Sequence, residues 1–271
     1  MAQSEKIGSY IEHFDDALGG GFPKGHIVLI YGSAGTMKSS ICFNILFNEI
    51  LTGKKGAYIS IEQSSLSLLK QIVSLGFDIS KSNIEVLNDA EDVLKGLAKL
   101  KPGEPKKLTL VDFGTVRKFL KKMQTKKSKN TPFALSNDMM ETIKEMIQTL
   151  VNRDLCDILV IDSLTAIYSL TELQDPRSEI FYLFEFFRDL GLTVFIISEE
   201  NHESTRFSHF GIESYLADGI IHLQLTERNR KVTREVNVVK MRSSSCNNDI
   251  FTLEFDGRKF RALYGGKIPL L

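Results

Sequence analysis

The stretch "YGSAGTMKSS", Tyr31 to Ser40, restricts the possible folds of this chain more than any other feature. It follows the apolar, β-rich run "HIVLIY" and precedes apolar residues that recur at helical spacing. In a strand–glycine turn–helix unit, the backbone N–H groups of the turn and the N-terminus of the helix point toward the same position. An anion bound at that position is stabilised. The sequence therefore predicts an α/β fold with a phosphate-binding loop after a buried strand.

The spacing of this stretch matches a Walker A loop except at Met37, which stands where such loops carry glycine. We expect Lys38 to reach the β- and γ-phosphates of ATP and the Ser39 hydroxyl to ligate Mg²⁺. The alternative is a glycine-rich turn with a purely structural role. The predicted nucleotide-binding residues are Gly32, Ser33, Ala34, Gly35, Thr36, Met37, Lys38, Ser39 and Ser40.

Two carboxylates come at the ends of apolar runs that read as buried strands. "ILVID" ends in Asp162, and "AYISIE" ends in Glu62. Ligands of open α/β sheets bind at the carboxyl ends of the strands. We therefore expect Asp162 to hold Mg²⁺ together with Ser39, and Glu62 to activate the water that attacks the γ-phosphate. The alternatives are a helix cap for Asp162 and an exposed loop residue for Glu62.

The remaining chain alternates strand and helix patterns up to about residue 198, which favours a mainly parallel sheet flanked by helices. Helices are predicted near 115–123, 137–152 and 176–189. Short strands then follow one another closely, and Asp256-Gly257 between two alternating runs predicts a hairpin. We therefore expect antiparallel strands at the C-terminal end to extend the parallel core.

One of these late strands, "VVKMR", carries Lys240 and Arg242 two residues apart, so both side chains point to the same face. One interpretation is a solvent-exposed face. The other is a pair of cations that reach the charge developing on a transferred phosphoryl group, as an arginine finger does.

Overall charge gives no indication of a nucleic-acid or membrane partner, because Lys plus Arg (34) balances Asp plus Glu (34). A lysine-rich insertion at about residues 101–136 is the local exception, and it has no acidic residue from Phe113 to Asn137. It is interpreted either as a solvated loop or as a contact for nucleic acid or an acidic partner. Its lysines include Lys118, Lys121, Lys122, Lys126, Lys127 and Lys129.

The three cysteines are far apart and form no C-x-x-C pair, which favours a reducing compartment over a disulfide scaffold. No apolar run approaches membrane-spanning length, and the first residues contain no apolar targeting segment. The sequence predicts a cytoplasmic protein without a membrane partner.

Taken together, these motifs resemble the KaiC-like ATPases of the RecA/RadA superfamily. The resemblance is carried by "GSYIEHFDDALGGGFPKGHIVLIYGSAGTMKSS", "AYISIEQS", "ILVIDSLTAIY", "IESYLADGIIHL" and "VVKMRSS", in the order of the family. It implies one RecA-like ATPase domain over 1–271, bound to ATP and Mg²⁺. It also implies self-association into a ring, usually a hexamer, with the active site between neighbours.

Residue by residue, the resemblance makes Lys38 the Walker lysine, Ser39 and Asp162 the Mg²⁺ site, and Glu62 the first of two catalytic glutamates. Lys240 and Arg242 match the cations that one subunit supplies to the γ-phosphate of its neighbour. The chain departs from the family at Met37, at Gln63 in place of the second glutamate, and at Ser243 in place of glycine. Clock-type members carry two such domains in tandem, so the resemblance implies no circadian role for this single domain.

Three functions are compatible with these observations. The first is a slow Mg²⁺-dependent ATPase whose nucleotide controls ring assembly and partner binding, with a regulatory or signalling role. The second is a scaffold or switch that holds ATP without hydrolysing it, which Met37 and Gln63 motivate. The third is a DNA-repair accessory of the recombinase-paralogue type. The lysine-rich insertion supports it, but the loops after "IDSLTAIY" and "FIISEEN" hold few of the cations that a DNA channel needs.

Overall fold

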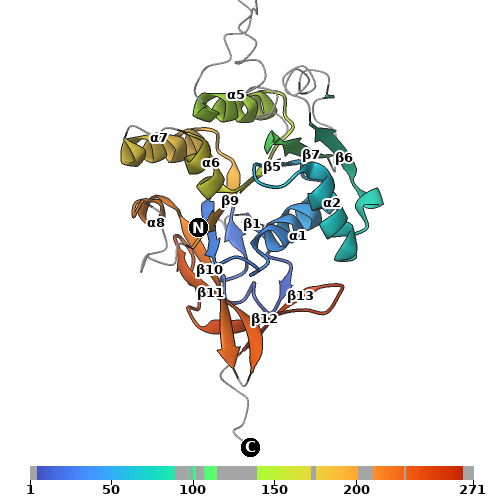
Figure 1. Ribbon diagram of the computed structural model, residues 1–271, viewed down its shortest axis with the longest axis vertical. Coiled ribbons are helices and arrows are strands. Elements are labelled where there is room, and N and C mark those ends of the chain that lie inside the picture. The colour runs from blue at the N-terminus through green and yellow to red at the C-terminus, as the bar shows by residue number, and fades with distance from the viewer. Residues whose placement is uncertain are drawn as a thin grey trace, which may run out of the picture.

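The computed structural model describes residues 5–88, 97, 100–101, 107–114, 139–171, 175–200, 210–228 and 230–264. These residues build a long twisted sheet with helices on both faces (Figure 1). The strand order is β2-β13-β12-β11-β10-β4-β9-β8-β5-β7-β6, and a separate pair joins β1 (Lys6–Ile7) to β3 (Phe22–Pro23).

The middle of the sheet is parallel, because each of its strands returns through a crossover connection. β9 lies between β4 and β8, and β5 lies on the far side of β8. β4, β5, β8 and β9 are buried on both faces, which explains their apolar runs, whereas β6 at the edge of the sheet is only partly buried. Their bounds are β4 (Ile27–Gly32), β5 (Gly56–Ser60), β6 (Asn83–Leu87), β7 (Lys107–Asp112), β8 (Ile158–Asp162) and β9 (Thr193–Glu199).

The C-terminal strands are antiparallel, as predicted. β10 pairs with β4 in parallel and with β11 in antiparallel register, and a hairpin with Gly257 at φ 87° joins β12 to β13. The predicted fold class is thereby confirmed. The bounds are β2 (Ile11–Glu12), β10 (Gly219–Arg228), β11 (Lys231–Met241), β12 (Ile250–Phe255) and β13 (Phe260–Tyr264).

Helices cover the sheet in two layers, with one hydrophobic core on each face. Alternate residues of β4 serve the two cores: Leu29 belongs to the core under α5, α6 and α7, and Ile30 to the core under α1 and α2. The bounds are α1 (Lys38–Leu51), α2 (Ser65–Ser74), the 3₁₀ turn η1 (Ile79–Lys81), α5 (Met139–Asn152), α6 (Leu164–Leu170), α7 (Pro176–Asp189) and α8 (Glu213–Leu216).

Two of the three helices predicted between 115 and 189 are confirmed, as α5 and α7. Asp175 accepts a hydrogen bond from the Ser178 N–H and Pro176 opens α7, which explains its sharp start. The predicted helix at 115–123 and all the lysines of the proposed nucleic-acid contact lie outside the described residues. In the part of the chain that is described, no helix is long and apolar enough to cross a membrane.

Candidate nucleotide-binding site

The predicted phosphate loop connects β4 to α1, and its backbone adopts the tight conformation that such a loop requires. A Cβ on Gly32 would lie 2.0 Å from the Leu223 carbonyl oxygen, so the close approach of β10 demands glycine there. Gly35 has φ 80°, and Met37 has φ 72° and ψ 26° directly before α1. Met37 thus adopts the left-handed conformation that glycine prefers, at a strain of about 1 kcal/mol. Its partly buried side chain packs against the core under α1.

Lys38 begins α1 and lies over the loop that precedes it. Its side chain is buried, and Nζ donates hydrogen bonds to the carbonyl oxygens of Gly32 and Ser33, both at 2.9 Å. Burial lowers the pKa of Lys38, and the negative charges of Glu199 and Asp162 oppose that shift. An ammonium group has three N–H donors, so these two bonds leave one donor for a further oxygen.

Asp162 lies at the end of β8, where two hydroxyls orient its carboxylate. The Tyr58 hydroxyl donates to Oδ2 at 2.5 Å, and the Ser39 side chain also hydrogen-bonds Asp162. Burial raises the pKa of Asp162, and the hydrogen bonds from Tyr58 and Ser39 counteract this. Sequence reasoning missed Tyr58, because its position under Asp162 depends on the pairing of β5 with β8.

The Ser39 hydroxyl and the Asp162 carboxylate lie together, as a Mg²⁺ site at a phosphate loop requires. Among the described residues no group of three His, Cys, Asp or Glu side chains could hold a metal by itself. Mg²⁺ keeps several waters and is commonly bound by one or two protein oxygens together with phosphate oxygens. The donor set present here fits an ion of that kind, carried in with a nucleotide.

Glu62 follows β5 and is exposed to the same space. The Ser163 hydroxyl, next to Asp162 in the chain, donates to Glu62 Oε1 and accepts the Ala166 N–H at 3.1 Å, which caps α6. Gln63 is turned elsewhere, because its Nε2 donates to Ser67 Oγ at 2.9 Å and to Gln71 Oε1 at 3.3 Å. Of the two adjacent positions, only Glu62 supplies a carboxylate.

These side chains surround one cavity of about 360 Å³. It brings together Lys38, Ser39, Glu62 and Asp162, as the sequence predicted. It also contains Glu199, the last residue of β9, which the prediction missed. The signal was available, since Glu199 ends an apolar strand as Glu62 and Asp162 do. The lining residues are Ala34, Gly35, Thr36, Met37, Lys38, Ser39, Ser40, Glu62, Gln71, Leu75, Asp162, Ser163, Ile197 and Glu199.

A second residue missed in the sequence, Arg234 on β11, contacts the phosphate loop from the other side. Its Nε–H donates to the Gly35 carbonyl oxygen at 3.1 Å. Leu225, its partner across β10 and β11, lies 3.9 Å from the position of a Cβ on Gly35. Arg234 therefore supports the loop at Gly35, where the backbone has a positive φ.

Lys240 and Arg242 do not reach the phosphate loop of their own chain. The strand register places Met241 opposite Gly219 and Gly219 beside Val28, near the start of β4. The two cations are thus three to five residues, about 10–16 Å along the strands, from Gly32. Lys240 Nζ donates to three carbonyls of the α8 segment, and burial lowers its pKa, as does the charge of Arg242.

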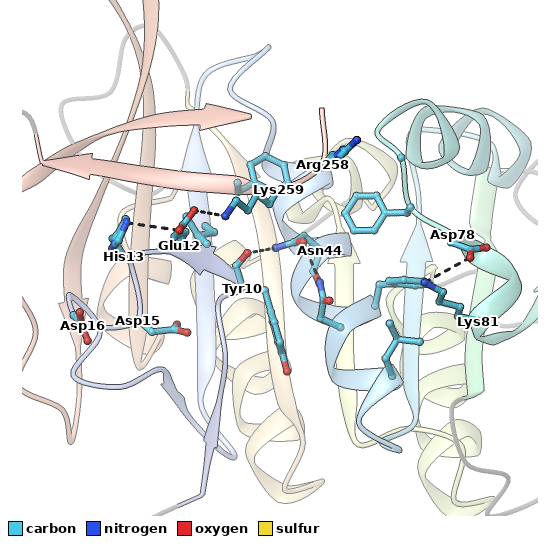
Figure 2. Close-up of a pocket in the computed structure, with 17 residues that line it drawn as sticks. Tyr10, Glu12, His13, Asp15, Asp16, Asn44, Asp78, Lys81, Arg258 and Lys259 are labelled. Atoms are coloured by element: carbon cyan, nitrogen blue, oxygen red, sulfur yellow. Dashed lines mark hydrogen bonds and ion pairs between the residues drawn. The ribbon is translucent and has the colours of Figure 1, made fainter. Parts of the chain in front are cut away.

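A larger cavity, of about 680 Å³, lies on the other side of α1 (Figure 2). Asn44 and Asn48 of α1 line it. The β12–β13 turn, which carries Arg258 and Lys259, lies above Asn44 in the view. Several of its charges are paired, with Lys259 2.7 Å from Glu12 and Lys81 3.7 Å from Asp78. The lining contains no residue of the phosphate loop. Its charged residues are Glu12, Asp15, Asp16, Asp78, Lys81, Arg258 and Lys259, with His13.

Comparisons with known proteins identify relatives of this chain. A UPF0273 protein from Saccharolobus solfataricus is 27% identical over 240 residues, covering 89% of this chain and 76% of that protein. The circadian clock protein KaiC3 from Synechocystis is 24% identical over 259 residues, covering 94% of this chain but 45% of that protein. The chain thus spans less than half the length of the clock proteins it matches.

The fold has a solved counterpart. The crystal structure of a KaiC-like protein from Pyrococcus horikoshii superposes with a TM-score of 0.70 at 22% sequence identity, covering 96% of this chain and 99% of that one. A family model described as "ATPase: KaiC" matches residues 7–259, which include the phosphate loop, Glu62, Asp162, Lys240 and Arg242. The chain therefore belongs to the KaiC family of P-loop ATPases.

Proposed function

We propose that this protein is a slow, Mg²⁺-dependent ATPase whose active site is completed between copies of the chain, with a regulatory or signalling role. The supporting observation is the separation of its charged groups. Lys38, Ser39, Asp162 and Glu62 meet in one cavity at the carboxyl edge of the sheet, whereas Lys240 and Arg242 lie toward the opposite edge. Bound nucleotide would then control assembly, because it completes the contact between neighbours.

Each group has a distinct part in the proposed hydrolysis. The backbone N–H groups of residues 34–39 and the Lys38 ammonium bind the β- and γ-phosphates. Ser39 and Asp162 would hold Mg²⁺, which would neutralise phosphate charge. Glu62 takes a proton from water as the water oxygen bonds to the γ-phosphorus and the bond to the β-phosphate oxygen breaks. The products are ADP and inorganic phosphate.

The cavity of one chain is rich in negative charge, with Glu62, Asp162 and Glu199 against the single lysine Lys38 on its lining. A polyphosphate adds further negative charge, so its transition state needs additional cations. Lys240 and Arg242 are near the surface, with the Arg242 side chain 49% exposed, and fit that need if a neighbour presents them. Each copy would supply its two cations to one neighbour only, so the contact between copies is head-to-tail. The proposed ring follows from repeating this contact around the assembly.

Glu62→Gln tests the proposed base. We expect turnover to fall on the order of 10²–10⁴-fold, the usual contribution of a general base, while Mg-ATP binding stays within about threefold. Steady-state ADP release and calorimetry measure the two quantities. Glu254→Gln, an exposed glutamate on β12, is the matched control and should retain both. Unchanged turnover in Glu62→Gln would remove Glu62 from the mechanism.

Arg242→Ala tests completion by a neighbour. Light scattering with and without Mg-ATP should show an assembly of wild-type protein whose turnover per chain rises with protein concentration. Arg242→Ala should bind ATP and lose turnover on the order of 10³-fold, as removal of an arginine finger does. Arg258→Ala, on the β12–β13 turn, is the control. Full activity of Arg242→Ala, or turnover that is independent of assembly, contradicts the shared site.

One observation supports the alternative of an ATP-binding protein without significant hydrolysis. Gln63 stands beside Glu62 and its amide donates to Ser67 and Gln71, so these two adjacent positions supply one candidate base instead of two. The discriminating measurement is ADP production by freshly purified protein. No ADP over hours, together with tight ATP binding, favours the scaffold.

A further inference from the structure

We infer that a hydrogen bond between Tyr168 and Glu213 links each copy's own catalytic carboxylate to the cations that it supplies to the next copy. The inference rests on the proposed function, because it takes Glu62 as the base and Lys240 and Arg242 as groups that act on a neighbour. It assigns a positioning role to two buried residues and identifies α8 as part of the contact surface for a second copy.

The link begins at the nucleotide site. The Ser163 hydroxyl donates to Glu62 and accepts the Ala166 N–H, so the first turn of α6 is tied to the carboxylate. Ser163 also follows Asp162 directly. A shift of Glu62 or Asp162 on nucleotide binding or hydrolysis therefore acts on the start of α6, a helix of seven residues.

The second step crosses from α6 to the segment before α8. The Tyr168 hydroxyl donates to Glu213 Oε1 at 2.9 Å, and the Tyr168 ring meets Phe210 edge-on with centroids 4.8 Å apart. Glu213 is fully buried, and its carboxylate also accepts the N–H groups of Phe210 and Ile212 at 3.2–3.3 Å. A buried carboxylate held by such bonds has one favoured geometry. A movement of Tyr168 would therefore move Glu213, and with it the start of α8.

The third step joins α8 to the two cations. Lys240 Nζ donates to the carbonyl oxygens of Ser214 at 3.0 Å and Ala217 at 2.6 Å. Arg242 donates to the Tyr215 carbonyl oxygen at 2.9 Å and to Asp218 Oδ1 at 3.0 Å. The end of α8 therefore holds both cations, and its position sets how readily they turn to another acceptor.

The surface that results is suited to a second copy carrying nucleotide. Tyr215, whose carbonyl oxygen accepts a hydrogen bond from Arg242, is 68% exposed. Cations beside an exposed aromatic residue complement the cavity lined by Glu62, Asp162 and Glu199 on the neighbour, once phosphate is bound there. Whether ATP or ADP is bound in one site would then affect how Lys240 and Arg242 of the same chain are presented to the next site.

Tyr168→Phe is the most conservative test, since it removes one hydroxyl and keeps the ring. When wild-type and Glu62→Gln chains are mixed, turnover should fall more steeply than in proportion to the fraction of Glu62→Gln chains. The reason is that each inactive site also mispositions the cations that its chain supplies to the neighbour. With Tyr168→Phe in every chain, the loss should become proportional, and the Hill coefficient for ATP should fall to about 1. Tyr182→Phe, an exposed tyrosine on α7, is the control and should keep the steep loss.

Two further measurements separate this link from simple support of the core. Glu213→Gln disturbs the same link from the other side, because the Phe210 N–H contacts both carboxylate oxygens and would face the amide NH₂ in either orientation. It should reproduce the Tyr168→Phe mixing curve. In wild-type protein, hydrogen exchange at the Phe210 and Ile212 amides should differ between Mg-ATP and Mg-ADP. Identical exchange in the two states, or a steep mixing curve in Tyr168→Phe, overturns the inference.

The failure of the link differs from the failure of the proposed function. If Arg242→Ala retains full turnover, no cation is shared and the proposed function itself is wrong. If Arg242→Ala loses turnover while Tyr168→Phe behaves as wild type, the shared site stands and the Tyr168–Glu213 link is rejected.

Discussion

The two cavities on either side of α1 have similar kinds of residues but different organisation. The smaller one, about 360 Å³, is lined by a lysine and two serines from the first turn of α1 and by three carboxylates at the carboxyl ends of the adjacent parallel strands β5, β8 and β9. The larger one, about 680 Å³, collects side chains from the N-terminal segment, the outer side of α1 and two turns (Figure 2).

The difference shows that the nucleotide site is identified by several charged groups that point into one space, and not by the size of the cavity. In the larger cavity Glu12 is matched by Lys259 and Arg261, so its charge is already neutralised. In the smaller cavity burial shifts the pKa of Lys38 down and that of Asp162 up, which means that the fold holds both charges against their solvation preference. A bound metal–phosphate ligand would stabilise both charges, because it places phosphate oxygens beside Lys38 and a cation beside Asp162.

The largest expected effect that tests this comparison is the loss of Lys38. Lys38→Ala should weaken Mg-ATP binding at least on the order of 10²-fold, because it removes a buried cation from a phosphate site. Lys81→Ala, in the larger cavity, should leave the affinity within about twofold. Calorimetry on both variants measures the difference. Equal losses in the two variants would mean that phosphate is bound by overall surface charge instead of the loop.

Much of the smaller cavity was predictable because its parts are local in sequence. The strand, the glycine turn and Lys38 lie within thirteen consecutive residues, 26–38, and the carboxylates of Glu62 and Asp162 each follow an apolar run. The rule that ligands meet strand ends then brings them together without knowledge of strand order.

The missed residues depend on strand order and register, which no local pattern encodes. Glu199 lies in the site because β9 is placed between β4 and β8. Arg234 contacts the phosphate loop because β11 lies two strands from β4. Register also places Lys240 and Arg242 toward the far edge of the sheet, although their spacing alone is compatible with either edge. The larger cavity joins segments about 240 residues apart, and nothing in the sequence indicated it.

A smaller effect concerns stability. Because burial raises the pKa of Asp162, its ionised form opposes folding at pH values above the unfolded pKa, and this penalty develops as the pH rises. Without nucleotide, Asp162→Asn should therefore stabilise the protein at neutral pH by roughly 0.5–2 kcal/mol, as relief of functional-site strain does. The gain should shrink as the pH falls toward 3.8 and vanish below it, where the carboxyl group is protonated in both states.

Urea denaturation between pH 4 and pH 7.5 measures this, with Asp16→Asn as the control in the larger cavity. Asp16 is exposed, so its replacement should change stability little at any pH. A gain for Asp162→Asn that is independent of pH, or a loss at neutral pH, would show that the hydrogen bonds from Tyr58 and Ser39 outweigh the burial of the charge.

The smallest effect compares the backbone of the two cavities, since each contains a non-glycine residue in the left-handed region, Met37 at φ 72° and His13 at φ 68°. At both positions alanine keeps the strain and glycine relieves it, so the alanine variant should be less stable than the glycine variant by about 1 kcal/mol. The two positions should differ in ligand binding. Met37 shapes the loop that wraps phosphate, whereas His13 does not contact it. Met37→Gly should therefore bind Mg-ADP a few-fold more tightly than Met37→Ala, with the His13 pair equal to each other. A difference at His13 as large as that at Met37 would mean that the larger cavity is coupled to the nucleotide site through α1.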